Sequence, residues 1–444
     1  MGAKTPNEGL RRVLAESRWS QAQLAMAVNR VGAEAGLPLR YDESAVSHWL
    51  SGTRPRKAVR PLIREALSRR LRRPVTLAEI ELEPEETAPD TDTVEGLMNL
   101  GRTDMDPSRR SVLGVGLFSV ALTVPGWQDV VGRMEAVRTG RGTRIGWPEV
   151  DMVIAMTERI SELDDQFGGR HARPMAASFM VNTVAAYLRA DAPEDVRKGM
   201  LSAASDLCYL TGYMAVDEGL QGLAQQYYLK ALELAGAAED HLTYCTTLRG
   251  MSVQAVDLGH GPEALRLADA AAAASPQAGP RMRAFLAGQQ AHAAAQTGDR
   301  RGALAYLREA EVAMEKAESR AKTFGSYNPS SLMYHVGQVR YELGDVPGSI
   351  AAMRESDKLR HHSFRRNRVR YLSMLAERQL QLGHLEAACS TWGKALDIYP
   401  QVQSGQCDER ISTMYASIRP HLRNRAAREL HERARAVAPA VLRA

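Results

Sequence analysis

The 444-residue sequence predicts an all-α protein, with a small basic domain of short helices first and a long array of paired helices after it. Three observations support this fold class. Alanine is abundant whereas aromatic residues make up only 6% of the chain, which favours close-packed helices over β-sheets. Apolar residues recur at helical spacing through most of the sequence. A motif of small residues repeats six times in the second half.

Charge is distributed unevenly along the chain. Residues 1–80 contain 15 Lys and Arg against 7 Asp and Glu, whereas residues 81–107 contain one Arg against 9 acidic residues. A basic domain followed by an acidic strip is typical of a nucleic-acid-binding protein with a solvated linker. We therefore expect a domain at 1–80 and an acidic, mostly extended linker at 81–107, with one helical turn around Val94–Leu100.

Capping residues divide the first domain into short helices. Asn7 and Ser20 each precede a run with helical apolar spacing, and Asp42 precedes the short run ESAVSHWL, which Gly52 ends. Helix-forming sequence resumes at Lys57 and continues to about residue 73. The domain is thus predicted to contain a set of short helices that begin after Asn7, Ser20 and Asp42 and near Lys57.

The run ESAVSHWL has one apolar and one polar face. Val46, Trp49 and Leu50 stand at positions i, i+3 and i+4, so we expect them in the domain core. Their spacing leaves four polar residues on the outer face: Glu43, Ser44, Ser47 and His48.

The stretches SQAQLA (20–25) and AVSHWLSG (45–52) resemble the pattern of repressor-type, XRE-like helix-turn-helix domains. In that family the second motif helix enters the major groove of double-stranded DNA. The resemblance implies base contacts from the outer face of ESAVSHWL and a base or backbone contact from Gln21. This chain is roughly ten residues longer between the two stretches. Either the first motif helix extends through Glu34, or Gly36–Tyr41 forms a wing.

Nine cations and one acidic residue, Glu65, lie between positions 54 and 73. Cations just beyond a recognition helix are placed to neutralise DNA phosphates, and we expect this role for them; the alternative is a solvated helix face. The cations are Arg54, Arg56, Lys57, Arg60, Arg64, Arg69, Arg70, Arg72 and Arg73.

Residues 108–198 are expected to form a helical connecting region. Its apolar run Val112–Val124 has 13 residues, too few to cross a bilayer as a helix, which takes about 20. A buried helix that docks the linker onto the second half is the favoured interpretation. A peripheral membrane contact is an alternative. The residues SRRSVL (108–113) resemble a twin-arginine export signal. Export is disfavoured, because such signals lie at the N-terminus, and the N-terminus of this sequence lacks an apolar signal segment.

Six small-residue units follow in near-register, with successive starts 40, 39, 46, 39 and 39 residues apart. Small residues at this spacing let two helices approach closely, and a Gly-Asp or Gly-His turn precedes three of the units. The pattern resembles the TPR repeat, lengthened from about 34 residues, and predicts a TPR-like α-solenoid at 199–444. The units begin at Ala224, Ala264, Ala303, Ser349, Ala388 and Ala427.

A TPR superhelix has a concave groove suited to a peptide or a partner helix. Polar residues on the predicted first helices are candidates for binding such an effector, and the alternative, favoured for each residue taken singly, is an ordinary surface position: Asn182, Gln254, Gln289 and Arg340. The cation-rich segment Lys358–Arg370 is a second candidate, for an acidic ligand; the alternative is a solvated loop between repeats.

The sequence argues against an enzyme. It has no phosphate-binding loop, zinc-protease motif or nucleophile elbow, so we expect no catalytic residues and no cofactor. His361 and His362 are adjacent and point apart on a helix, so we expect no metal site. The four cysteines form no CxxC pair, and we expect buried, reduced thiols.

Two further stretches, LDDQFGG (163–169) and MAVDEGLQGLAQQYYLKALELA (214–235), resemble actinobacterial regulators that join a helix-turn-helix to TPR-like repeats, similar to negative regulators of sporulation and antibiotic production. The resemblance implies a cytoplasmic transcription regulator, expected to be a repressor, that binds double-stranded DNA as a homodimer without membrane attachment and responds to a peptide or small-molecule effector. The competing hypothesis is a TPR interaction scaffold with only weak DNA binding.

Overall fold

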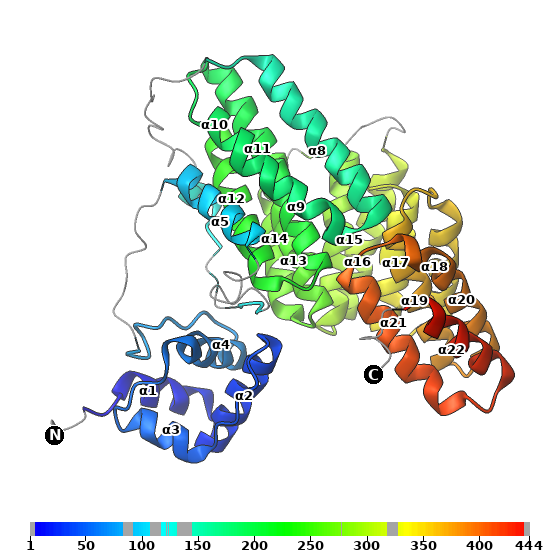
Figure 1. The fold of residues 1–444 in the computed structure, drawn as a ribbon, viewed down its shortest axis with the longest axis horizontal. Helices are drawn as coiled ribbons and strands as arrows, with labels where there is room; N and C mark the ends of the chain where they lie inside the picture. Colours follow the sequence, from blue (N-terminus) through cyan, green and yellow to red (C-terminus); the bar gives the residue numbers. More distant parts are fainter. Residues whose placement is uncertain are drawn as a thin grey trace.

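A computed structural model describes residues 5–82, 92–106, 117–120, 122, 124–130, 144–276, 278–317 and 327–438 (Figure 1). Within these ranges all regular secondary structure is helical, apart from one isolated bridge between Arg144 and Asp191. The predicted all-α class is confirmed for this part of the chain.

The N-terminal domain consists of α1 (Glu8–Ser17), α2 (Gln21–Glu34), α3 (Glu43–Leu50), the short 3-10 helix η1 (Lys57–Val59) and α4 (Arg60–Leu71). The predicted caps form: the side chains of Asn7, Ser20 and Asp42 accept hydrogen bonds from the first turns of α1, α2 and α3. Val46, Trp49 and Leu50 are buried in the core, as their spacing predicts. The core continues past residue 80, since Leu82 is buried in it.

The extra residues between the two motif stretches extend helix α2 to Glu34. The connection that follows, residues 35–42, contains no strand and so forms no wing. The side chain of Asn29 holds this connection against α2 through two 2.8 Å hydrogen bonds with the backbone of Tyr41. The ring of Tyr41 in turn packs edge-on against Trp49 of α3.

The second half of the acidic strip is helical, which corrects the expectation of an extended linker over 81–107. Helix α5 (Thr93–Met105) buries Val94, Leu97 and Leu100 against α9 and α12. Asp104 is buried as well, because Arg173 forms an ion pair with it and the Tyr227 hydroxyl donates a 2.9 Å hydrogen bond to it. The acidic composition suggested a solvated linker, but the segment forms an amphipathic helix, and its buried carboxylate, Asp104, has partners on other helices. Residues 83–91 lie outside the described ranges.

The apolar run at 112–124 is described only from Leu117 onward, with gaps at 121 and 123. Leu117–Ser119 form no helix, contrary to expectation, and side chains satisfy backbone groups of the segment instead. The amide N–H of Ser119 donates to Gln225, and that of Val120 donates to Glu65. Leu117 belongs to the core of the N-terminal domain and the next residue, Phe118, to the main core of the second half. We call residues 117–120 the strap.

A helical region connects the strap to the paired helices. It comprises α7 (Trp127–Val130), α8 (Trp147–Phe167), α9 (Gly169–Phe179), the π-helical turn η3 (Met180–Val184) and α10 (Ala185–Leu188).

Six consecutive helix pairs then follow, and the six sequence anchors lie fully buried on their second helices. In five pairs a glycine with φ between 76° and 84° turns the chain from the first helix to the second, a conformation that other residues rarely adopt. The pairs are α11 (Glu194–Asp217) with α12 (Gln221–Ala238), α13 (His241–Asp257) with α14 (Gly261–Ala273), α15 (Pro280–Gln296) with α16 (Arg300–Glu315), α17 (Pro329–Glu342) with α18 (Val346–Leu359), α19 (Arg365–Gln381) with α20 (Leu385–Ile398), and α21 (Gly405–Ile418) with α22 (Arg425–Val437). Short 3-10 turns η4 (Tyr399–Gln401) and η5 (Arg419–His421) end α20 and α21.

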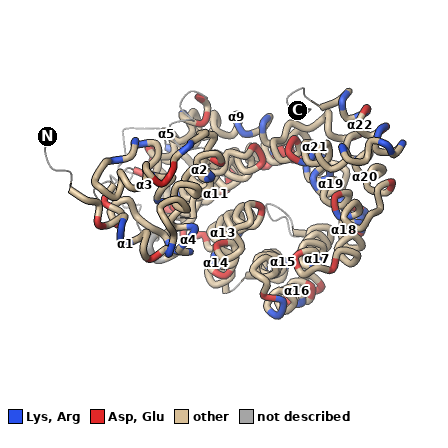
Figure 2. Tube along the Cα trace, turned by 90° about the horizontal axis from the view of Figure 1, so that it is seen from below, with Lys and Arg blue, Asp and Glu red and all other residues tan. Residues whose placement is uncertain are grey.

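The helix pairs follow a curve that brings its two ends together (Figure 2). The amide N–H of Gln403, before α21, donates to the carbonyl of Phe167 at the end of α8 (2.6 Å). The hydroxyl of Ser404 donates to Asp217 of α11 (2.7 Å), and Arg366 of α19 pairs with Asp164 of α8. These contacts close the array into a ring.

No helix in the described ranges is long and apolar enough to cross a membrane. The four cysteines are buried and free, as expected. Burial raises the pKa of the Cys245 thiol to about 11, which makes this thiol a poor nucleophile at neutral pH.

Candidate functional site

The outer face of α3 is open to solvent. Glu43, Ser44, Ser47 and His48 are all exposed, whereas Val46 on the opposite face is fully buried. Helix α3 packs on α1 and α2 and lies at the edge of its domain away from the helix pairs (Figure 1). Among the described residues, the domain meets the second half through α4 and the strap, and the polar face of α3 stays exposed.

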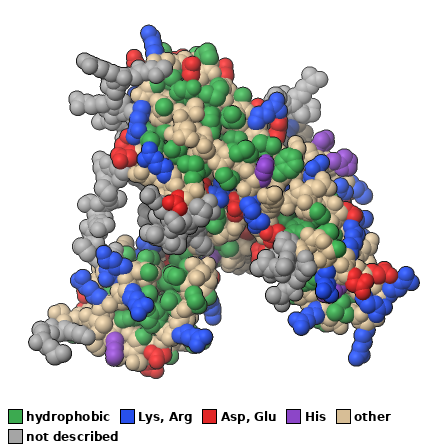
Figure 3. Space-filling view, viewed as in Figure 1, with side chains coloured by type: hydrophobic (Ala, Val, Ile, Leu, Met, Phe, Trp, Pro, Cys, Tyr) green, Lys and Arg blue, Asp and Glu red, His purple; other side chains and the backbone are tan. Residues whose placement is uncertain are grey.

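The three cations nearest the end of α3 have no acidic partner. Arg54, Arg56 and Lys57 are exposed and make no ion pair with the described residues. Arg60 differs, because its Nε donates to the carbonyl of Pro55 (3.1 Å) and this bond braces the connection between α3 and α4. Lys and Arg side chains are spread over the visible surface of this domain (Figure 3).

The later arginines of the 54–73 cluster are partly occupied by intramolecular pairs. Arg69 pairs with Glu65 and Glu34, and Arg73 pairs with Glu16 and Glu79. The Arg73 guanidinium holds the pKa of both its partners below the usual glutamate value. Residues 54–73 contain only one acidic residue, but three of these four glutamates lie outside this range in the sequence. The excess of positive charge counted in the sequence is therefore smaller in the folded domain. The expectation of phosphate contacts therefore narrows to the cations just after α3.

Gln21 is the first residue of α2 and is half-buried. The hydrogen bonds that cap this helix involve Ser20 and Gln23. Gln21 therefore stands at a helix start, where backbone N–H groups and the positive end of the helix dipole favour an anion such as a phosphate.

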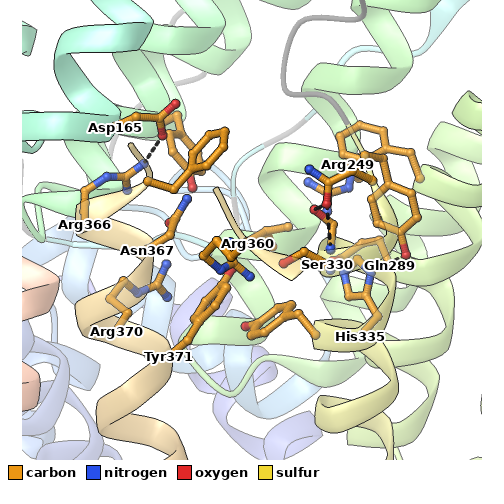
Figure 4. A pocket seen from close by; sticks show the side chains of 18 of the residues that line it. Asp165, Arg249, Gln289, Ser330, His335, Arg360, Arg366, Asn367, Arg370 and Tyr371 are labelled. Atoms are coloured by element: carbon orange, nitrogen blue, oxygen red, sulfur yellow. Dashed lines mark hydrogen bonds and ion pairs between the residues drawn. The ribbon is translucent and has the colours of Figure 1, made fainter. Parts of the chain in front are cut away.

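A second candidate site lies on the inner side of the ring (Figure 4). It is a partly open cavity of about 200 Å³, and we call it the inner cavity. Helix α8 and the first helices of five consecutive pairs line it: α11, α13, α15, α17 and α19. The second helices are absent from this lining and lie outside.

Of the four residues expected to bind an effector, only Gln289 lines the inner cavity, where it donates a 2.9 Å hydrogen bond to Ser252. Gln254 is fully buried, and its amide bonds to Gln221 instead. Asn182 is exposed on η3 and Arg340 is exposed near the end of α17, so neither reaches the cavity. The structure therefore does not bring these four residues together.

The cation-rich segment 358–370 forms one wall of the cavity. Arg360, Arg366 and Arg370 line it, and the last two are buried, so this part of the segment is not a solvated loop. Arg370 pairs with Asp257 of α13 (3.3 Å). Arg366 pairs with Asp164 (2.9 Å), and burial raises the pKa of this carboxyl to about 7 despite the nearby guanidinium.

Several cavity residues on the other walls were not predicted from the sequence. Tyr209, Arg249 and Tyr334 each stand ten residues before the turn glycine of their pair, and Gln289 stands nine before its own. All four line the cavity. The distance along the chain to the turn glycine could thus have predicted which residues face the cavity, whereas the polarity of a residue alone could not.

Residues 10–83 match the SP15 N-terminal domain family. The match covers most of α1 and all of α2–α4, with the exposed face of α3. A comparison of the chain with curated proteins finds no match.

Proposed function

We propose that this protein is a sequence-specific, double-stranded DNA-binding transcription regulator. In this proposal α2 and α3 form a helix-turn-helix whose second helix enters the major groove, and the paired helices form a TPR-like array that binds an effector or dimerises. The observation that carries the proposal is the exposed polar face of α3, followed by Arg54, Arg56 and Lys57, which make no ion pair with the described residues.

Each part of this surface has a distinct expected task. Ser47 and His48 are presented for base contacts, with Glu43 and Ser44 nearer the start of the helix. Arg54, Arg56 and Lys57 contact phosphates and position the domain, and Gln21 adds a contact at the start of α2. A single small domain buries little surface on DNA, so we expect a homodimer on two half-sites, in the cytoplasm, and repression as the outcome.

The experiment measures binding of the full chain to DNA as a function of salt. Arg54→Gln/Arg56→Gln is expected to weaken binding to all sequences and to reduce the slope of log K against log salt by about one to two. The matched control is Arg300→Gln/Arg301→Gln, which removes two exposed arginines from α16 and should leave the slope unchanged. An unchanged slope in the first variant contradicts the proposal.

Selection from fragmented genomic DNA distinguishes the proposal from the scaffold alternative. A regulator enriches one sequence, and Ser47→Ala/His48→Ala should alter which bases are preferred while phosphate contacts persist. Recovery of no preferred sequence would favour the interaction scaffold.

A further inference from the structure

The inner cavity has more cations than its carboxylates neutralise. Four arginines line it, on α13, before α19 and on α19, together with three aspartates. Arg366 pairs with Asp164 and Asp165, and Arg370 pairs with Asp257. Among the described residues, no carboxylate forms an ion pair with Arg249 or Arg360. These two guanidinium groups therefore leave an excess of positive charge in a partly enclosed space.

Both unpaired arginines are held in place by aromatic rings. The guanidinium of Arg249 lies 3.8 Å from the ring centre of Phe285, and that of Arg360 lies 4.3 Å from the ring centre of Tyr371. A cation over a ring face is oriented without being neutralised, so its N–H groups remain able to bind an anion. In the view of Figure 4, Arg360 lies between Arg249 and Arg366, among the aromatic side chains of the cavity.

Polar atoms buried around the cavity lack protein partners. The Nε atoms of Arg249 and Arg360 have no hydrogen-bond partner among the described residues, nor does the side-chain oxygen of Asn367. Arg249 has the Tyr209 hydroxyl as a partner, and burial raises the pKa of that hydroxyl to about 12, so it adds no negative charge near neutral pH. Unused buried donors are costly unless a ligand or water meets them.

Aromatic side chains form much of the rest of the wall. Phe285, Tyr334 and Tyr371 line the cavity, and the last two rings stack with centres 4.3 Å apart. His292 is neutral near pH 7, because burial and then the charges of Arg378 and Arg249 lower its pKa to about 3. The wall thus suits the flat, apolar body of a ligand, while the arginines suit an acidic group.

We propose that the inner cavity binds a small organic anion, whose acidic group lies between Arg249 and Arg360 and whose flat apolar body packs against the aromatic wall. Carboxylate, phosphate and sulfonate share this chemistry, because each offers several acceptor oxygens to a guanidinium. The biological role of this ligand as effector rests on the proposed function. The binding of the ligand to the cavity does not rest on the proposed function, because this binding is measured without DNA.

The probe is 8-anilinonaphthalene-1-sulfonate, an aromatic anion that fluoresces on binding, titrated into the full chain. N-phenyl-1-naphthylamine, which lacks the sulfonate, is the neutral counterpart. In the unaltered protein the sulfonate probe should saturate one site and bind at least about tenfold more tightly than the neutral probe. Equal affinity for the two probes overturns the proposal without any variant.

Arg249→Met and Arg360→Met keep much of the apolar stem and remove the charge. Each should weaken the sulfonate probe by about tenfold or more and change the neutral probe by less than about threefold. Arg249→Lys should retain most of the binding, since it keeps a cation. Arg340→Met, which removes an exposed arginine outside the cavity, is the matched control and should change neither probe. Unchanged sulfonate binding in both cavity variants, or equal weakening of both probes, refutes the anion site.

Failure of the anion site and failure of the proposed function give different results. Anion binding without DNA binding would support the cavity and reject the regulator, and DNA binding without anion binding would do the reverse. Adding the probe to the DNA titration then tests the link: a ligand that acts as effector must change DNA affinity, and DNA must change ligand affinity by the same factor.

Discussion

Arg366→Met is expected to weaken the closure of the ring severely. Arg366 on α19 lies 2.9 Å from Asp164 of α8 and 3.4 Å from Asp217 of α11, and the three side chains are 1%, 3% and 0% exposed. Methionine fills similar space, so the loss is mainly electrostatic. Removing one partner from a buried ion pair costs about 3–5 kcal/mol, because the remaining charge stays buried and uncompensated.

The loss should depend on pH in a defined direction. Burial already raises the pKa of Asp164 from 3.8 to about 7, so the folded protein binds a proton there that the unfolded chain lacks between these values. Stability from this group therefore falls as pH rises through that window. Without Arg366 the carboxyl pKa rises further. The variant should consequently lose more stability at about pH 8 than at about pH 5, where protonation relieves the buried charge.

The assay is urea unfolding followed by circular dichroism at both pH values. Arg340→Met is the control: Arg340 is exposed and donates one 3.3 Å hydrogen bond to the Gly348 carbonyl, so it should change stability by less than about 0.5 kcal/mol. Arg366→Lys keeps the charge and should fall between the two. A deficit below about 1 kcal/mol at the higher pH, or one independent of pH, would refute the account of ring closure by this buried pair.

Two further predictions concern other carboxyls. Glu65→Ala removes the acceptor for the Ser119 hydroxyl (2.7 Å) and for the Val120 amide (2.9 Å). Amide hydrogen exchange at Val120 should therefore become about tenfold faster or more. Unchanged exchange would show that Glu65 does not hold the strap. Burial, with a smaller contribution from Asp240, raises the pKa of Asp206 from 3.8 to about 7, so its contribution to stability also falls as pH rises through this window. Asp206→Asn should therefore raise Tm relative to the unaltered protein by about 2–4 °C at about pH 8 and by less at about pH 5, whereas an equal shift at both would contradict the assignment.

Local patterns in the sequence were sufficient for the capped helices of the N-terminal domain and for the buried face of α3. Caps such as Asn7, Ser20 and Asp42 act within three residues, and the face formed by Val46, Trp49 and Leu50 follows from the helical period alone. The spacing of small residues likewise located the second helix of each pair. These features depend on neighbours close in the chain, which is why a single sequence contains them.

Tertiary structure decided which charges are available. Glu16 and Glu34 neutralise arginines that seemed free in the sequence, and Asp104 became part of a buried helix because Arg173 reaches it from α9. The inner cavity is likewise assembled from six helices distant in sequence. Its unpaired Arg249 can be recognised only once the ring has closed, because whether a charge is paired depends on distances through space that no spacing along the chain encodes.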